Sequence, residues 1–147
     1  MRVYLAAAMT NGSRDVGAIG AVLAAIEALG HEVPTRHVAD PLGRDVEGPV
    51  TDAEVARRDL AWVAGSDALV AEVSAPSHGV GVEVAAALRG GLPVLLLHRR
   101  GALVSRLLLG LDGVEAADYA DAGEAALAVR LFLARHAHLP TRPEALA

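Results

Sequence analysis

A serine- and glycine-rich turn with a glutamate behind it is the part of this sequence best suited to chemistry. The turn, at 74–81, follows an apolar segment at 67–73 that is typical of a buried strand, and an alanine-rich helical segment comes after it. Backbone N–H groups at such a strand-to-helix turn point toward bound anions. Glu83 comes six residues after Ser77, in the first turn of the expected helix. This spacing predicts a site that holds a small phosphorylated substrate beside a carboxylate able to attack it or accept its proton.

Three other side chains could join this chemistry, and each also has a purely structural interpretation. Asp59 follows two arginines on an expected helix, where it could belong to a solvated ion pair. Tyr4, one of two tyrosines, could be a core aromatic residue, and His37 lies in a long polar loop where it could contact a ligand. Glu83 itself could reflect only the preference of acidic residues for helix N-termini, and Ser77 could simply shape the turn. The residues alone leave both interpretations open.

The sequence lacks the residue patterns of several other kinds of functional site. It contains no cysteine for thiol nucleophiles or thiolate metal sites, and no lysine for a Walker-type phosphate loop. The pair Gly79 and Gly81 lacks the third glycine of a dinucleotide fingerprint. His136 and His138 are two residues apart on an expected helix and therefore face different ways. We expect no metal ion and no organic cofactor.

Length and composition indicate one compact domain. With 147 residues we expect a single domain over 1–138 and a proline-containing tail over 139–147. Hydrophobic residues make up 53% of the chain and aromatic residues only 3%, so the core must consist of alanine, valine and leucine. A net charge of −5 without a basic stripe argues against binding to a long nucleic acid. No segment is apolar for long enough to cross a membrane, and we expect a soluble, cytoplasmic protein.

Apolar segments and helical periods alternate along the chain, as in a parallel α/β sheet. The expected strands are 3–8, 31–35, 67–73, 93–98 and 114–119, and the expected helices are 16–29, 52–63, a segment ending near 89, 104–109 and 123–136. Thr51 and Glu54 form the pattern of a capping box before the second helix. We therefore predict a doubly wound, five-stranded parallel sheet in a three-layer sandwich, flavodoxin- or Rossmann-like. Ligands of such sheets bind at the carboxyl ends of the strands, where the loops after the first and third strands would meet near Tyr4.

Three motifs resemble the nucleoside 2-deoxyribosyltransferase superfamily, and most closely its branch of 2′-deoxynucleoside 5′-monophosphate N-hydrolases (the Rcl-like enzymes). The motifs are Val3-Tyr4-Leu5-Ala6, Arg58-Asp59-Leu60-Ala61-Trp62, and the block 70–73 leading into Pro76-Ser77-His78-Gly79-Val80-Gly81-Val82-Glu83. They occur in the family's order and span nearly the whole chain. Two positions differ, because Thr10 stands where the family often has an arginine and Val82 where it often has an aromatic residue.

The resemblance implies a role for each candidate. Glu83 would be the nucleophile, Asp59 would act at the base and leaving group, and Tyr4 would orient the nucleophilic carboxylate. The resemblance also implies a homodimer in which a serine of one chain, Ser105, reaches the phosphate of the substrate bound to the other chain. The remaining expected substrate-binding residues are Ser77, Gly79, Gly81, His37, Thr10, Asn11 and Gly12.

The implied reaction is hydrolysis of the N-glycosidic bond of a 2′-deoxynucleoside 5′-monophosphate to a free base and deoxyribose 5-phosphate. Such a bond breaks through an oxocarbenium-like state that one carboxylate can stabilise or capture, while a second acid helps the leaving base depart. Glu83 and Asp59 could supply these two groups. Three alternatives stay open: a deoxyribosyltransferase, a ribonucleotide N-glycosidase of the CMP type, and a nucleotide-binding sensor without catalytic activity.

Overall fold

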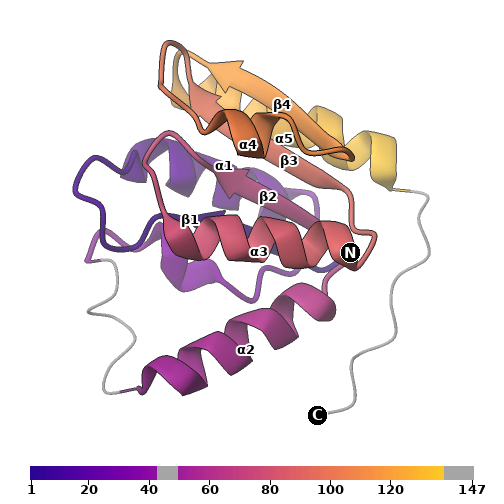
Figure 1. Cartoon of the computed structure of the whole chain (residues 1–147). Helices are drawn as coiled ribbons and strands as arrows, with labels where there is room; N and C mark the ends of the chain where they lie inside the picture. The colour runs from indigo at the N-terminus through magenta and orange to yellow at the C-terminus, as the bar shows by residue number, and fades with distance from the viewer. Residues whose placement is uncertain (43–49, 138–147) are drawn as a thin grey trace.

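A parallel sheet lies at the centre of the computed structural model, which describes residues 1–42 and 50–137 (Figure 1). Within these residues the strands are β1 (Val3–Ala7), β2 (Ala68–Glu72), β3 (Val94–Arg99) and β4 (Val114–Tyr119), in that order across the sheet. Each neighbouring pair is parallel. All residues of β1 and β2 are buried, as expected for strands covered on both faces, and their sequences are accordingly apolar almost throughout. The predicted α/β, Rossmann-like parallel sheet is confirmed.

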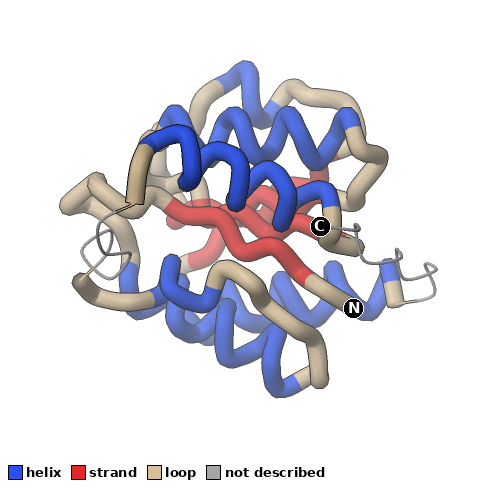
Figure 2. Tube along the Cα trace, turned by 90° about the horizontal axis from the view of Figure 1, so that it is seen from below, coloured by secondary structure: helices blue, strands red, loops and turns tan. Residues whose placement is uncertain are grey.

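Helices lie on both sides of the sheet (Figure 2). On one side α1 (Val16–Ala28) and α5 (Ala122–His136) share a core with side chains such as Leu5 and Val70. On the other side α2 (Asp52–Ala64) and α3 (His78–Arg89) share a core with the alternate strand residues, Tyr4 and Ala71 among them. Side chains of a strand alternate between faces, so Tyr4 points toward α2 and α3. The short helices α4 (Arg106–Leu109) and η1 (Arg36–Ala39) complete the described fold.

The predicted strand at 31–35 is wrong, so the described sheet has four strands rather than five. Only Glu32 forms an isolated parallel bridge, with Arg2. Pro34 follows and has no N–H to continue a ladder. The next N–H along β1 that faces this segment belongs to Leu5, and it donates to a side chain, Thr35 Oγ1, at 3.0 Å and not to a backbone carbonyl. The chain then turns into η1, and β1 remains the edge of the sheet.

The start of α3 also differs from the prediction. The helix begins at His78, so Gly79 and Gly81 lie in its first turns and not in a loop, and Glu83 lies in the second turn. Ser77 is the N-cap, and its hydroxyl accepts the N–H of Val80 at 3.4 Å. A serine cap stabilises a helix start by about 1 kcal/mol, which offsets part of the poor helix propensity of the two glycines.

The other predicted elements agree with the structure to within a few residues. The capping box before α2 is confirmed, with Thr51 and Glu54 each accepting from the other's backbone N–H. Residues 43–49 of the expected long loop, and 138–147 with His138 and the expected tail, lie outside the described residues. The division into a domain over 1–138 and a tail therefore stays a prediction. Within the described part of the chain, no helix is both long and apolar enough to span a membrane.

Candidate active site

A hydrogen bond between Tyr4 and Glu83 joins β1 to α3 on the face of the sheet that α2 and α3 cover. Tyr4 Oη donates to Glu83 Oε1 at 2.7 Å, between residues 79 positions apart in the sequence. The tyrosine is almost fully buried, with 2% of its surface exposed. Burial and the neighbouring Glu83 carboxylate raise the pKa of Tyr4 well above its usual range. The phenol therefore stays protonated and acts as a donor that fixes one carboxylate oxygen.

Glu83 lies in an environment that disfavours its charge. Burial raises the pKa of Glu83, the hydrogen bond from Tyr4 lowers it, and the nearby Asp59 raises it again, with a net upward shift. A carboxylate that is poorly solvated and held by a single donor is more reactive than one in water. Glu83 is thus suited to nucleophilic attack or to proton transfer.

Asp59 faces the same space from α2. A cavity of about 570 Å³ lies between α2, α3 and the carboxyl end of β1, a size that suits a small-molecule ligand. Seven of the predicted site residues line it: Tyr4, Thr10, His37, Asp59, Ser77, Gly79 and Glu83. The folding of the chain therefore brings together both candidate carboxylates, the tyrosine and the cap of α3.

Four predicted residues lie elsewhere. Gly81 and Ser105 line a second, apolar hollow between α3 and α4, which Ser77 also borders. Asn11 ties the first loop to the start of α3, because its side-chain amide donates to the carbonyl oxygen of Pro76 at 3.2 Å. Gly12 lines neither hollow, and the space around its Cα is open.

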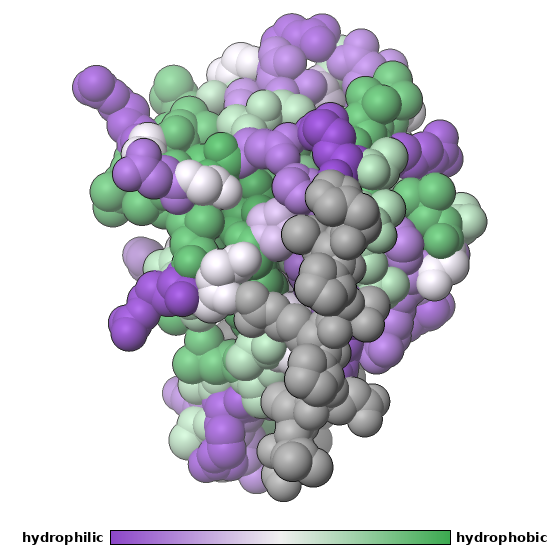
Figure 3. Space-filling model, turned by 90° about the vertical axis from the view of Figure 1, so that its right-hand side faces the viewer, coloured by the Kyte–Doolittle hydropathy of each residue, from purple (hydrophilic) through white to green (hydrophobic). Residues whose placement is uncertain are grey.

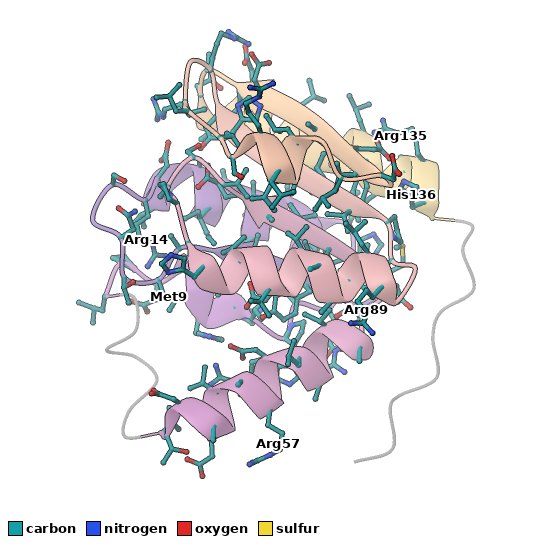
Figure 4. All side chains as sticks on the ribbon, in the orientation of Figure 1. Met9, Arg14, Arg57, Arg89, Arg135 and His136 are labelled. Carbon is teal, nitrogen blue, oxygen red and sulfur yellow. The ribbon has the colours of Figure 1, made fainter. Side chains whose placement is uncertain are left out.

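Sequence reasoning missed several residues that shape the cavity. Arg14 donates to the carbonyl oxygen of Val38, which also lines the cavity. Figure 4 shows Arg14 and Met9 together at the end of the molecule where α3 begins, and Met9 is another lining residue. On α2, Arg58 pairs with Asp59 and stacks on Trp62. The spacing of Arg58 and Trp62, one helical turn apart, was the one available signal for that stack.

Among the described residues, the charged side chains that line the cavity are acidic. Three of its lining residues are acidic, namely Asp52, Asp59 and Glu83, and the one histidine among them is His37. His37 lies against Trp62, with ring centres 6.0 Å apart. Within residues 1–42 and 50–137, no three histidine or acidic side chains are arranged to hold a metal ion. The expectation that no cofactor is needed stays a prediction.

Comparisons with known proteins identify relatives of this chain. A protein of Thermofilum pendens named 2′-deoxynucleoside 5′-phosphate N-hydrolase 1 is 41% identical over 129 residues, which cover 85% of this chain and 90% of that protein. The 5-hydroxymethyl-dUMP N-hydrolase of Mus musculus is 34% identical over 147 residues, covering 94% of this chain and 82% of the mouse protein. No protein-family model matches the chain.

Solved structures share the fold. The CMP N-glycosidase of Clostridium botulinum aligns with a TM-score of 0.68 at 21% identity, over 90% of this chain and all of that one. A 2-deoxyribosyltransferase of Bacillus psychrosaccharolyticus aligns with a TM-score of 0.61 at 20% identity, over 86% of this chain and 90% of its own. At these identities the likeness concerns the fold alone. The sequence relatives decide the family, and the chain belongs to the 2′-deoxynucleoside 5′-phosphate N-hydrolases.

Proposed function

We propose that this protein hydrolyses the N-glycosidic bond of a 2′-deoxynucleoside 5′-monophosphate, releasing the free base and deoxyribose 5-phosphate. The observation that carries the proposal is the 2.7 Å hydrogen bond from Tyr4 to Glu83 beside a cavity that Asp59 also lines. The reaction needs two carboxyl groups with separate tasks, and this arrangement supplies them. The names of the relatives support the choice of substrate class.

In the first step, Glu83 attacks the anomeric carbon while the bond from that carbon to the base nitrogen breaks. Tyr4 holds Oε1, so we assign the attack to Oε2. The base leaves with the electron pair of the broken bond and takes a proton from Asp59, which enters this step as the carboxylic acid. This step yields a neutral free base, a glycosyl ester of Glu83, and Asp59 as a carboxylate.

In the second step, a water molecule attacks the same carbon and the ester bond to Glu83 breaks. Asp59 accepts the proton that the water loses, so both carboxyl groups return to their starting states. If a second base attacked in place of water, the same ester would give a transferase. The molecule that attacks the ester therefore decides between a hydrolase and a deoxyribosyltransferase, and the residues involved are the same in both.

The 5′-phosphate is assigned to the N-terminus of α3. Its cap Ser77 and its first-turn residue Gly79 line the cavity, and free backbone N–H groups at a helix start attract anions. The first loop, with Thr10, Asn11 and Gly12, would flank the phosphate, since Asn11 is tied to the loop before α3. The acidic remainder of the cavity would repel a phosphate dianion and so favours this end for it.

We further propose a homodimer that forms through the apolar surface around α4. Leu103 and Leu107 are 95% and 77% exposed, and Val82 on α3 is 59% exposed. These residues border the hollow that also contains Ser105. The side of the molecule on which α3 and α4 lie forms the left margin of Figure 3, where hydrophobic residues reach the surface. A partner covering this surface would bring Ser105 of the partner subunit toward the phosphate bound at Ser77.

A substrate panel tests the activity. Deoxynucleoside monophosphates, ribonucleoside monophosphates and nucleosides are incubated with the protein, and the released base is measured by chromatography. We expect release from a deoxynucleoside monophosphate, much faster than from the bare nucleoside. Base exchange without net hydrolysis would instead identify a transferase. A preference for CMP would identify a ribonucleotide hydrolase, and tight binding without any product would identify a sensor.

Mixed dimers test the shared site. A Ser105→Ala chain is mixed with a Glu83→Gln chain, so that one site of each mixed dimer has both residues intact and the other has neither. Activity should rise above that of both parent proteins. If mixed dimers form and activity does not rise, Ser105 acts within its own chain or has no role.

A further inference from the structure

Arg58 is a cation on α2 that contacts both Asp59 and Trp62. Its Nε donates to Asp59 Oδ1 at 2.8 Å, and its guanidinium carbon lies 4.8 Å from the centre of the Trp62 ring. Both charged side chains are largely shielded, with 28% of Arg58 and 20% of Asp59 exposed. Trp62 lies one turn further along the helix, so the three side chains form a continuous stack along α2.

The charge of Arg58 also reaches the Tyr4–Glu83 pair. Burial and the Glu83 carboxylate raise the pKa of Tyr4, whereas Arg58 acts in the opposite direction. Asp59 and Glu83 are two carboxyl groups that share one cavity, and Asp59 in its carboxylate form raises the pKa of Glu83. Arg58 is a cation paired with Asp59, and its Nε donates to Oδ1, the contact by which it can fix the orientation of the carboxyl group beside the cavity.

We propose that Arg58 is a positioning residue that aims Asp59 at the leaving base, and that Trp62 holds Arg58 in place for this task. The inference rests on the proposed function. A fixed guanidinium stabilises the carboxylate form of Asp59, which is the form left after its proton has passed to the base. Since that charge develops in the transition state, the contact should act on kcat more than on KM.

Trp62 fluorescence tests the coupling without using activity. Trp62 is the single tryptophan of the chain, and the guanidinium covers one face of its ring. Arg58→Met should expose the ring and raise the constant for quenching by acrylamide. Asp59→Asn should raise it too, because Arg58 loses the carboxylate that helps to fix it. Arg57 is the matched control: it is the adjacent arginine, is exposed, and points away from the molecule in Figure 4, so Arg57→Met should leave quenching unchanged.

Kinetics of a double-mutant cycle test the catalytic role. Loss of a charge-assisted hydrogen bond predicts a fall in kcat of roughly tenfold to a hundredfold for Arg58→Met, with KM nearly unchanged. Arg58→Lys keeps the positive charge but loses the planar guanidinium, so its kcat should lie between those of Arg58→Met and wild type. The double variant with Asp59→Asn should be no slower than Asp59→Asn alone, because both changes remove the same interaction.

Three results would overturn the inference. The first is an Arg58→Met enzyme whose kcat matches that of Arg57→Met, and the second is a double variant in which the two losses multiply. The third is an Asp59→Asn protein whose Trp62 is quenched as in wild type. If wild type releases no base from any nucleotide, the proposed function fails, and the quenching data alone still decide whether Arg58 and Asp59 hold each other.

Discussion

Replacing Glu83 by glutamine should abolish activity and at the same time stabilise the protein at neutral pH. Burial raises the pKa of Glu83 above its ordinary value of 4.5, the Tyr4 hydrogen bond partly offsets this shift, and Asp59 adds to it. A raised pKa means that the folded protein holds the carboxylate less well than the unfolded chain does. Glutamine keeps the shape and still accepts the hydrogen bond from Tyr4, but it carries no charge to desolvate.

The two expected effects are read in different measurements. Loss of a covalent nucleophile should lower kcat by about a thousandfold or more, some 4 kcal/mol in barrier height. Glutamine removes the charge that burial disfavours, so the Tm of Glu83→Gln at pH 7 should lie above that of wild type.

The stability difference between wild type and Glu83→Gln should depend on pH. Below the ordinary pKa, Glu83 is protonated in the folded and the unfolded chain, so wild type and Glu83→Gln should unfold alike. As pH rises through the raised folded-state pKa, wild type should lose stability relative to the variant. Thermal unfolding at pH 4 and pH 7 measures this difference.

Glu54 provides a control of opposite sign. Its hydrogen bonds with Thr51 in the capping box lower its pKa, so its stabilising effect is present at neutral pH and is lost in acid. Glu54→Gln should therefore be slightly less stable than wild type at pH 7. The assignment of Glu83 as a buried nucleophile is refuted if Glu83→Gln unfolds at or below the wild-type temperature at pH 7, or if it retains more than a tenth of the wild-type rate.

Three further variants should follow the same contacts. Tyr4→Phe removes one donor to a charged group and should lower kcat roughly tenfold to a hundredfold. Because Glu83 also loses a hydrogen bond that lowers its pKa, the acid limb of the pH–rate profile should move to higher pH. Ser77→Ala should reduce stability by about 1 kcal/mol as a lost cap and should weaken kcat/KM for a monophosphate far more than for a nucleoside, as unfolding and kinetic assays would measure. Leu103→Asp should convert the proposed dimer to monomers in size-exclusion chromatography; an unchanged elution volume would count against the α4 surface.

Much of the fold could be predicted from apolar segments and turn residues. Segments such as 3–7 and 68–72 are apolar almost without interruption, a pattern that only strands covered on both faces explain at this length. Once the strands are parallel, their carboxyl ends share one edge, and Tyr4 and Glu83 can meet across 79 positions of sequence. Topology thus predicts that the two residues lie at the same edge, and the contact between them was predicted from the family resemblance.

Two predicted segments were wrong because side-chain hydrogen bonds determine the backbone conformation there. The segment 31–35 has the residues of a strand, but Pro34 ends the ladder and the Thr35 hydroxyl takes the position of the next carbonyl. At 77–81 the glycines suggested a loop, yet the cap by Ser77 begins a helix there. The sequence allowed an ion pair of Asp59 with an arginine and a contact between Arg58 and Trp62, but only the side-chain conformations show that Arg58 makes both contacts.

The distance along α3 between the proposed phosphate site and the proposed nucleophile, Glu83, can be compared with the length of the substrate. Ser77 caps this helix, and Glu83 comes six residues later, a rise of about 9 Å along the axis. A phosphate at the cap and an anomeric carbon at Glu83 would therefore lie along one rigid element, with the sugar between them. The carboxylates further into the cavity would then face the part of the substrate that becomes positive in the transition state, while the phosphate would meet only the positive end of the helix dipole. In this arrangement a bare nucleoside would lose the contact that places its anomeric carbon at Glu83, so the missing phosphate should lower kcat as well as raise KM.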